Sequence, residues 1–553
     1  MPVIAFIVYP AKNAINEAFK GREPWEIVGV TSTTILAAVW FYNFIFQDES
    51  IVERSKKTAM NLIKRIPAVR DKIESESQRL SKQFEEATLK RTKSLTYTLN
   101  LPEKPIDSKE IVKLVERHIS LGDFDWDKGR VSGCVYHANT ELKKLITEVY
   151  GMASYTNPLH PDVFPGICKM EAEIVRMVCR LFGGNDETCG SMTSGGTESI
   201  LLACKAYRDY ARETKGITKP EMVIPVTAHA AFDKAAQYLR IKVRYVPINP
   251  DSYTVSIAAI RRAINGNTIM LACSVPNFPY GTMDNVEAIA HLGEKYNIPV
   301  HVDACLGGFL VCFMKAAGYP LPEFDFRLKG VTSISADTHK YGYAPKGTSL
   351  ILYRNKKFRH HQYTITTDWL GGLYGSPTVN GSRAGGLIAA CWATMMYYGF
   401  DGYVEATRKV IDTAKFIEQE LRQMDGIYVM GSPATSVIAF ASSDFHIFNL
   451  CDGLHEKGWS LNTLQFPSAI HICVTHVHTQ PGVAQQFVND VKSELAKMMK
   501  DKPKIIEGMS LVQPESGDDI DGLRMKRGCH ETSHVQKNQS SYGCLQTRRI
   551  PIC

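Results

Sequence analysis

The chain has 553 residues, of which 44% are hydrophobic and 22% charged, and its formal net charge is +7. A chain of this length is expected to form two domains with appendages. The modest charge gives no indication of nucleic-acid binding, because Lys and Arg do not gather into one long patch. The 14 cysteines are scattered without zinc-type spacing, so we expect reduced thiols and no metal centre.

An uncharged stretch near the start, residues 27–46, predicts a transmembrane helix following a short lumenal segment, residues 1–26. Twenty residues suffice to cross a hydrocarbon core of roughly 30 Å as a helix. A buried core helix and a signal peptide are the alternatives, although no convincing cleavage site follows. Positive charge flanks the stretch unequally, which places the remainder of the chain in the cytosol. The basic residues after it are Arg54, Lys56, Lys57, Lys64, Arg65, Arg70 and Lys72; those before it are Lys12, Lys20 and Arg22.

Residues 47–105 are rich in Lys, Glu, Ser and Arg, which predicts a charged linker or an exposed helix. From residue 106 the pattern becomes that of a globular protein. Helices are expected at 110–119 and 141–150, within an N-terminal helical segment of the catalytic unit over residues 106–184.

Residues 185–380 alternate between short apolar runs and helical patterns, which predicts a mostly parallel sheet with helices on both faces, an α/β fold. The expected strands are 222–226, 268–273, 298–304, 331–336 and 348–353, and the expected helices are 198–213, 256–265 and 285–296. A helix over 403–424 and strands in "ATSVIAFAS" and "IHICVT" predict a smaller α+β domain over residues 381–507. The tail, residues 508–553, has no sustained apolar period, so we expect it to be largely disordered.

Chemically useful residues follow several of these strands, and ligands of such sheets bind beyond the carboxyl ends of the strands. "TSGGTES" at 193–199 opens a helix, where backbone N–H groups can hold a phosphate. His229 and the pair His339 and Lys340 each follow a predicted strand, and Asp303 lies at the end of one. Alone, the turn is equally well a helix cap and His229 a structural histidine. A carboxylate such as Asp303 is costly beside an apolar run unless a cation partners it.

Together these residues fit pyridoxal phosphate. That cofactor needs a lysine to hold its aldehyde as a Schiff base, a carboxylate near its pyridine nitrogen, a phosphate cradle and a flat group against its ring. Lys340, Asp303 and His229 supply the first, second and last of these, as the candidate catalytic residues. The predicted phosphate cradle consists of Thr193, Ser194, Gly195, Gly196 and Thr197. With His339, these residues form the predicted cofactor site, and their order along the chain is more specific than any one of them.

The segments "TSGGTES", "AHAAFDKAA", "HVDACLGGF" and "SADTHKYGYAPKG" resemble the fold-type I pyridoxal-phosphate enzymes of the group II decarboxylase family. Within that family the chain resembles the sphingosine-1-phosphate lyases, also through "YTNPLHPDVFPG", "DWLGGLYGSPTVNGSRAGG" and "LNTLQFPSAIHICVT". The resemblance spans about residues 25–507. It implies a retro-aldol cleavage of phosphorylated sphingoid bases, yielding a long-chain fatty aldehyde and phosphoethanolamine. It also implies a homodimer with shared active sites, anchored in the membrane of the endoplasmic reticulum.

A lyase of this kind must also bind the phosphate of its substrate. By resemblance, the candidates are Tyr136, His160 and Lys346, with Asn157 orienting the substrate and Arg383 as a further candidate. A lysine is a compact charge well suited to phosphate. Each has an ordinary alternative: a core tyrosine, a loop histidine or a surface lysine. The segment "GGLYGSP" is expected to reach the cofactor phosphate of a partner subunit.

Three functions remain open at this point: the lyase, a decarboxylase acting on an amino acid, and a membrane-tethered pseudoenzyme. The intact cofactor positions argue against the last. The general base is also open, since the freed Lys340, a histidine or a phosphate oxygen could serve. After Gly508 the chain departs from the lyase pattern, in which an apolar, helix-forming segment follows at this place.

Overall fold

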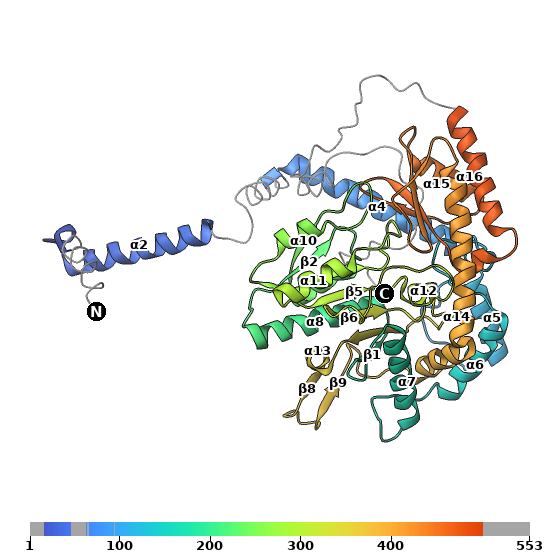
Figure 1. Cartoon of the computed structure of the whole chain (residues 1–553), viewed down its shortest axis with the longest axis horizontal. Helices are drawn as coiled ribbons and strands as arrows, with labels where there is room; N and C mark the ends of the chain where they lie inside the picture. Colours follow the sequence, from blue (N-terminus) through green and yellow to red (C-terminus); the bar gives the residue numbers. More distant parts are fainter. Residues whose placement is uncertain (1–15, 46–61, 64–65, 93–94, 501–553) are drawn as a thin grey trace. The chain divides into compact units, whose positions relative to one another are not determined.

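The computed structural model describes residues 16–45, 62–63, 66–92 and 95–500 (Figure 1). The chain divides into a first unit that ends at Gly122 and a second that begins at Asp123. The predicted tail, residues 508–553, lies outside the described residues, as do residues 1–15 of the predicted lumenal segment.

The first unit contains the apolar helix expected near the start, α2 (Pro24–Ile45). It begins three residues before the predicted span, at a proline, which is favoured in the first turn of a helix. Its window Pro24–Phe41 has a mean hydropathy of 1.2 and is unburied, so α2 is long and apolar enough to cross a membrane. The hydroxyls of Thr33 and Thr34 donate to the carbonyls of Gly29 and Val30 at 2.8 Å, which satisfies them within the helix.

Two further helices with full bounds belong to this unit. The charged region expected as a linker or exposed helix forms α4 (Pro67–Thr92), while residues 46–61, 64–65 and 93–94 are outside the described residues. Helix α5 (Ser108–Ile119) begins where Asp107 accepts a hydrogen bond from the Lys109 N–H at 2.9 Å, a standard N-cap.

A seven-stranded sheet lies at the centre of the second unit, in the order β1-β7-β6-β5-β4-β2-β3. Strands β2 to β6 run parallel to their neighbours, whereas β7 pairs antiparallel with both β6 and β1. The prediction of a mostly parallel sheet is therefore confirmed. The bounds are β1 Cys189–Thr193, β2 Glu221–Pro225, β3 Lys242–Val246, β4 Thr268–Ser274, β5 Val300–Asp303, β6 Val331–Ala336 and β7 Ser349–Tyr353.

Helices cover both faces of this sheet (Figure 1). Alternation along β2 shows the two faces: Val223 belongs to one hydrophobic core, and Met222 and Ile224 belong to the other. The first core includes residues of α7, α11 and α12, and the second includes residues of α8 and α9. The bounds are α6 Thr140–Ala153, α7 Pro165–Leu181, α8 Gly196–Lys215, α9 Ala231–Leu239, α10 Ile257–Ala263, α11 Val286–Tyr296, α12 Gly308–Met314 and α13 Lys356–His360.

The C-terminal part forms the expected α+β layer. Helix α14 (Gly385–Arg422) starts well before the predicted 403–424, and its backbone breaks at Gly399, where φ is +55°. An antiparallel sheet of order β10-β11-β13-β12 follows. The bounds are β8 Thr364–Thr366, β9 Tyr374–Ser376, β10 Tyr428–Val429, β11 Val437–Ala441, α15 Ile447–Glu456, β12 Asn462–Leu464, β13 Ala469–Cys473 and α16 Val483–Lys500; short 3₁₀ turns span Trp126–Lys128 and His476–Thr479.

Candidate active site

The strand directions bring the predicted site residues to one edge of the large sheet. Because β5 and β6 are parallel, Asp303 at the end of β5 and Lys340 after β6 lie beyond the same edge. Strand β7 reverses direction and β1 reverses it again, so the end of β1 at Thr193 meets that edge too. Thr193 pairs with Ser349, the first residue of β7, and Leu350 pairs with Ala336 at the end of β6.

The turn between β1 and α8 is held by side chains beneath it. Thr193 and Ser199 share a hydrogen bond of 2.7 Å, and Ser199 contacts Ser349 at 2.9 Å. The Ser194 N–H and hydroxyl both donate to Glu198 Oε2, at 2.6 and 2.7 Å. Glu198 is thereby committed to the turn rather than to a ligand. The exposed turn at the positive end of a 20-residue helix fits a phosphate.

Gly196 lies so close to the lysine loop that no side chain fits there. A Cβ atom at this position would lie 2.7 Å from Cys305 Sγ and 2.8 Å from Asp337 Oδ1. A Cβ at Gly195 would be 3.9 Å from Cε1 of His339. The glycines therefore bring the phosphate turn against the loops after β5 and β6.

Lys340 forms an ion pair with Asp337, at 3.0 Å between Nζ and Oδ2. Burial disfavours its charge, but the Asp337 carboxylate outweighs burial and raises the pKa of Lys340. Burial likewise opposes the ionised form of Asp337, but the pKa of Asp337 is lowered overall, and the positive charge of Lys340 is the largest influence in that direction. Sequence analysis did not single out Asp337, which the i, i+3 spacing before Lys340 could have suggested.

Asp303 is 6% exposed, and within the described ranges no cationic side chain forms an ion pair with it. Its Oδ1 accepts hydrogen bonds from the Cys305 N–H at 3.1 Å and the Ser335 hydroxyl at 3.4 Å. Its Oδ2 receives no hydrogen bond from the described part of the chain. This arrangement suits a protonated ring nitrogen, which would supply both the charge and the missing donor.

His229 is a neutral ring between α9 and the end of β2. Its Nδ1 accepts from the Ala231 N–H at 3.1 Å, so the proton of the neutral ring is on Nε2. Desolvation lowers the pKa of His229; the charge of Asp303 opposes this and that of Lys340 adds to it. A neutral, accessible imidazole in this position is compatible with the predicted flat group against the cofactor ring.

His339 is oriented by the backbone. Its Nδ1–H donates to the Thr348 carbonyl, and its Nε2 is 3.6 Å from Asp337 Oδ2. Desolvation lowers the pKa of His339, with Asp337 opposing and the two cations Lys346 and Lys340 adding to the effect. Because the proton of the neutral ring is on Nδ1, Nε2 carries no proton to donate to Asp337.

Lys346 and Tyr136 form a second, separate contact near Lys340. The Lys346 Nζ lies 4.7 Å from the Tyr136 ring centroid, a cation–π contact, and Tyr136 packs edge-on against Tyr341 at 4.9 Å. Desolvation and the charge of Lys340 lower the pKa of Lys346. Lys340 and Lys346 are both positively charged and repel each other. An anion beside Lys346, in addition to Asp337 beside Lys340, would relieve this repulsion.

The other three candidates are placed differently. Asn157 Oδ1 accepts from the N–H groups of Leu159 and Arg383, and its Nδ2 donates to Ser382 Oγ, each at 3.1 Å. The Arg383 guanidinium pairs with Glu171, both half-buried. His160 is exposed. Asn157 therefore ties two loops together, and Arg383 is already paired.

Comparison with known proteins decides the family. Residues 91–442 match the model of the pyridoxal-dependent decarboxylase conserved domain. A sphingosine-1-phosphate lyase of Drosophila melanogaster is 58% identical over 90% of this chain and 92% of its own length. A sphingosine-1-phosphate lyase 1 of Mus musculus is 48% identical, over 91% and 88%. The chain belongs to the sphingosine-1-phosphate lyases, within the pyridoxal-dependent decarboxylase family.

A solved structure agrees with this assignment. A sphingosine-1-phosphate lyase of Burkholderia pseudomallei is 40% identical, with a TM-score of 0.71, over 73% of this chain and 94% of its own. The fold-type I architecture predicted from the sequence is confirmed, as is pyridoxal phosphate as the cofactor of the family. The residues present fit that cofactor: Asp303 Oδ2 lacks a donor, and the close turn at Gly195 and Gly196 leaves its N–H groups for a phosphate.

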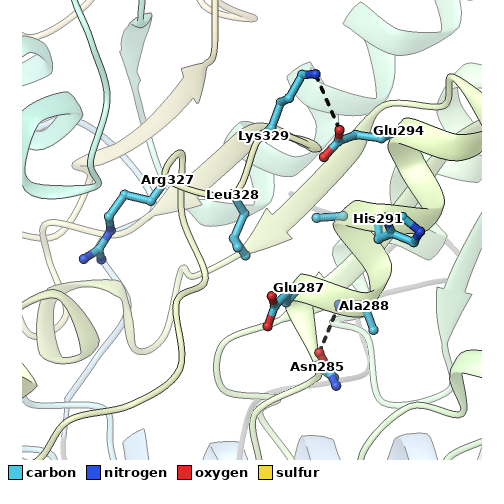
Figure 2. A pocket seen from close by; sticks show the side chains of 9 residues that line it. Asn285, Glu287, Ala288, His291, Glu294, Arg327, Leu328 and Lys329 are labelled. Atoms are coloured by element: carbon cyan, nitrogen blue, oxygen red, sulfur yellow. Dashed lines mark hydrogen bonds and ion pairs between the residues drawn. The ribbon is translucent and has the colours of Figure 1, made fainter.

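A surface hollow elsewhere in this lyase is unrelated to the cofactor site. It lies between α11 and the residues before β6, where Lys329 reaches Glu294 at 3.8 Å (Figure 2). None of the predicted site residues lines it. Its lining residues are Asn285, Glu287, Ala288, Ala290, His291, Glu294, Arg327, Leu328 and Lys329.

Proposed function

We propose that this chain cleaves phosphorylated sphingoid bases, including sphingosine-1-phosphate, to a long-chain aldehyde and phosphoethanolamine. The observation that carries the proposal is the presence of two separate cationic positions, Lys340 on Asp337 and Lys346 over Tyr136. A cleavage of this substrate needs one lysine for the cofactor and a second positive group for the substrate phosphate. The relatives named as sphingosine-1-phosphate lyases support the same substrate.

Pyridoxal phosphate, when bound, supplies an electron sink that accepts the electrons of the broken carbon–carbon bond. The side chains of this chain hold and orient the reacting groups. Lys340 Nζ supplies the amine that holds the cofactor and must give up its proton before it can do so. The carboxylate of Asp303 would stabilise the protonated ring nitrogen of the cofactor near its Oδ2. The neutral His229 ring offers a flat surface for the cofactor ring.

The substrate phosphate is assigned to Lys346 and Tyr136. Lys346 offers a charge-assisted hydrogen bond, and Tyr136 is 8% exposed, so its ring holds the lysine in place. His160 and Asn157 are proposed to complete this end of the site from the loop before α7. Arg383 contributes through its pair with Glu171, which fixes the loop before α14.

The substrate assay separates the proposed function from its alternatives. The purified full chain with pyridoxal phosphate is incubated with sphingosine-1-phosphate and, separately, with aromatic and acidic amino acids. We expect long-chain aldehyde and no carbon dioxide. Carbon dioxide from an amino acid would support a decarboxylase instead. Cofactor binding without turnover of either substrate would indicate a pseudoenzyme.

Substitution of Lys346 tests the phosphate assignment. Lys346→Ala should raise KM for sphingosine-1-phosphate about tenfold to a hundredfold, because a hydrogen bond to a charged group contributes about 1.5–3 kcal/mol. The variant Lys346→Arg keeps the charge and should lose less. Steady-state kinetics with a dephosphorylated analogue are the control. An equal loss on that analogue would contradict the role.

The apolar helix α2 supports the proposal of a single-pass anchor in the endoplasmic reticulum, with the catalytic unit in the cytosol. A substrate with a long acyl-like chain partitions into a bilayer, since each buried CH₂ contributes about 0.8 kcal/mol. An enzyme tethered to the same bilayer meets it there. Removal of residues 1–61 should shift the chain from the membrane pellet to the supernatant. In the full-length chain, a tag fused to the N-terminus should be protected from protease added to sealed membranes, whereas the catalytic unit should be digested. A full-length chain in the supernatant would contradict the anchor.

We further propose a homodimer. The β8–β9 hairpin presents a cluster of large apolar side chains, Trp369, Leu370 and Leu373, which are 57%, 105% and 78% exposed. Such a cluster is typical of a surface covered by a partner. Light scattering of the detergent-purified chain should give twice the mass of one chain, and the mass of a single chain would refute the dimer.

A further inference from the structure

A buried histidine lies directly behind Asp303 and has no role in the site described so far. His301 is fully buried on β5, two residues before Asp303. Strand side chains alternate, so both residues point to the same face of the sheet. On the neighbouring strand β6, Ser333 pairs in register with His301 and Ser335 pairs with Asp303. The four side chains therefore form two adjacent rows.

These side chains form one continuous line of hydrogen bonds. His301 Nδ1 contacts Ser333 Oγ at 2.7 Å, and His301 Nε2 contacts Ser335 Oγ at 3.1 Å. Ser335 Oγ then donates to Asp303 Oδ1 at 3.4 Å. At the far end, the Tyr207 hydroxyl of α8 donates to Ser333 Oγ at 2.6 Å.

The direction of every bond in this line can be deduced. Ser335 uses its only proton on Asp303, so its oxygen must accept from His301 Nε2, which leaves Nδ1 to accept from Ser333. The Tyr207 hydroxyl lies within hydrogen-bond distance of both Ser333 Oγ, at 2.6 Å, and Thr332 Oγ1, at 2.7 Å. Burial lowers the pKa of His301 to about 4, although Asp303 opposes this, so the ring is neutral. A neutral ring that accepts at Nδ1 must donate from Nε2, to Ser335. All donors thus point toward Asp303.

We propose that His301 is a positioning residue for Asp303, acting through Ser335 to hold Asp303 Oδ1 and to leave Oδ2 facing the ring nitrogen of the bound cofactor. The Ser335 hydroxyl could otherwise turn away from the carboxylate. The His301 N–H occupies the lone pair of Ser335 and forces its proton toward Asp303. The contact of 3.4 Å is the longest in the line, so it depends most on where His301 holds Ser335.

This inference concerns the cofactor, and it rests on the proposed function only where turnover is measured. The line sits on the rigid centre of the sheet, and Phe232 of α9 packs edge-on against His301 at 6.0 Å between ring centroids. This ring contact is a further restraint on the position of His301. Loss of His301 should affect Asp303 without altering the phosphate turn or Lys346.

Three variants test the role. His301→Leu removes both ring nitrogens, Ser335→Ala removes the donor to Asp303, and His301→Gln keeps a side-chain N–H that can reach Ser335. The full chain is stripped of cofactor and titrated with pyridoxal phosphate, and the absorbance of the bound cofactor is followed against pH. We expect His301→Leu and Ser335→Ala to weaken cofactor affinity about tenfold, the scale of one hydrogen bond to a charged group. Both should also change the pH dependence of the absorbance, and His301→Gln should restore much of each.

Kinetics and a double variant complete the test. On sphingosine-1-phosphate, kcat should fall about tenfold with KM nearly unchanged. The double variant His301→Leu, Ser335→Ala should be no worse than either single variant, because both break the same line. The control Ser442→Ala removes a hydroxyl that donates to the Gly426 carbonyl at 2.6 Å, far along the chain, and should change neither cofactor affinity nor absorbance.

The outcomes are decisive in each direction. Additive losses in the double variant, or an unchanged absorbance profile in Ser335→Ala, would overturn the proposal. If His301→Leu does not fold, Ser335→Ala and His301→Gln still decide it. A wild-type chain that binds pyridoxal phosphate but leaves sphingosine-1-phosphate intact would refute the proposed function, while the cofactor titrations would still test His301.

Discussion

The variant Lys340→Ala should lose aldehyde formation by about a thousandfold or more, because it removes the amine proposed to hold the cofactor covalently. Within the described residues, Lys340 is the lysine paired with the buried Asp337, beside the glycine turn. The variant should also lose the absorbance of covalently held cofactor. Absorbance spectra and aldehyde release from sphingosine-1-phosphate measure the two effects.

A surface lysine provides the matched control for this substitution. Lys315, exposed at the end of α12, can be replaced by alanine without touching the site. Lys315→Ala should keep both the spectrum and the rate. Aldehyde formation by Lys340→Ala at more than a few percent of the wild-type rate would contradict the central assignment.

The sequence predicted the sheet edge well because its signals are local. An apolar run followed by a small, charged or ionisable residue, as in "HVDACLGG" and "VTSISADTHK", indicates a buried strand and the loop that carries the site. These runs became β5 and β6. The order of the motifs along the chain therefore predicted which residues would lie near Lys340 before any distance was known.

Other elements have weak local signals. Strand β1, "CGSMT", contains a glycine and few β-branched residues, and β3, "KVRYV", is short and only half-buried, so neither was predicted. The first half of α14 is apolar all round, which hides the helical period, and Gly399 interrupts the pattern. Pairing with neighbouring elements, rather than propensity, places these segments.

The roles of the two carboxylates could not be separated from the sequence either. Both Asp303 and Asp337 follow a strand of the same sheet, but only Asp337 is paired with Lys340. The difference depends on side-chain direction across two loops and on the close approach of Gly196. In physical terms, Asp337 neutralises Lys340, and Asp303 has no ion-pair partner among the described residues.

This separation makes Asp303→Asn the second substitution with a large expected effect. An amide has no charge with which to stabilise a protonated ring nitrogen, so the electron sink should weaken. We expect kcat to fall about a hundredfold to a thousandfold, the scale seen when one preorganised electrostatic partner is removed. Cofactor affinity should fall as well, and the absorbance of the bound cofactor should shift. Cofactor titration and steady-state kinetics measure these effects.

Asp284 provides a control of matched burial and chemistry. It is 1% exposed, and its carboxylate accepts from the N–H groups of Val255 and Ser274 at 2.9 Å. Burial raises the pKa of Asp284 to about 6 despite these bonds. Its two oxygens are both used by backbone N–H groups, so its role is structural. Asp284→Asn should lower thermal stability but keep the cofactor spectrum. If Asp303→Asn behaved like Asp284→Asn, with lower stability and a normal spectrum, then Asp303 would be a structural carboxylate and the charge on the cofactor ring would depend on another group.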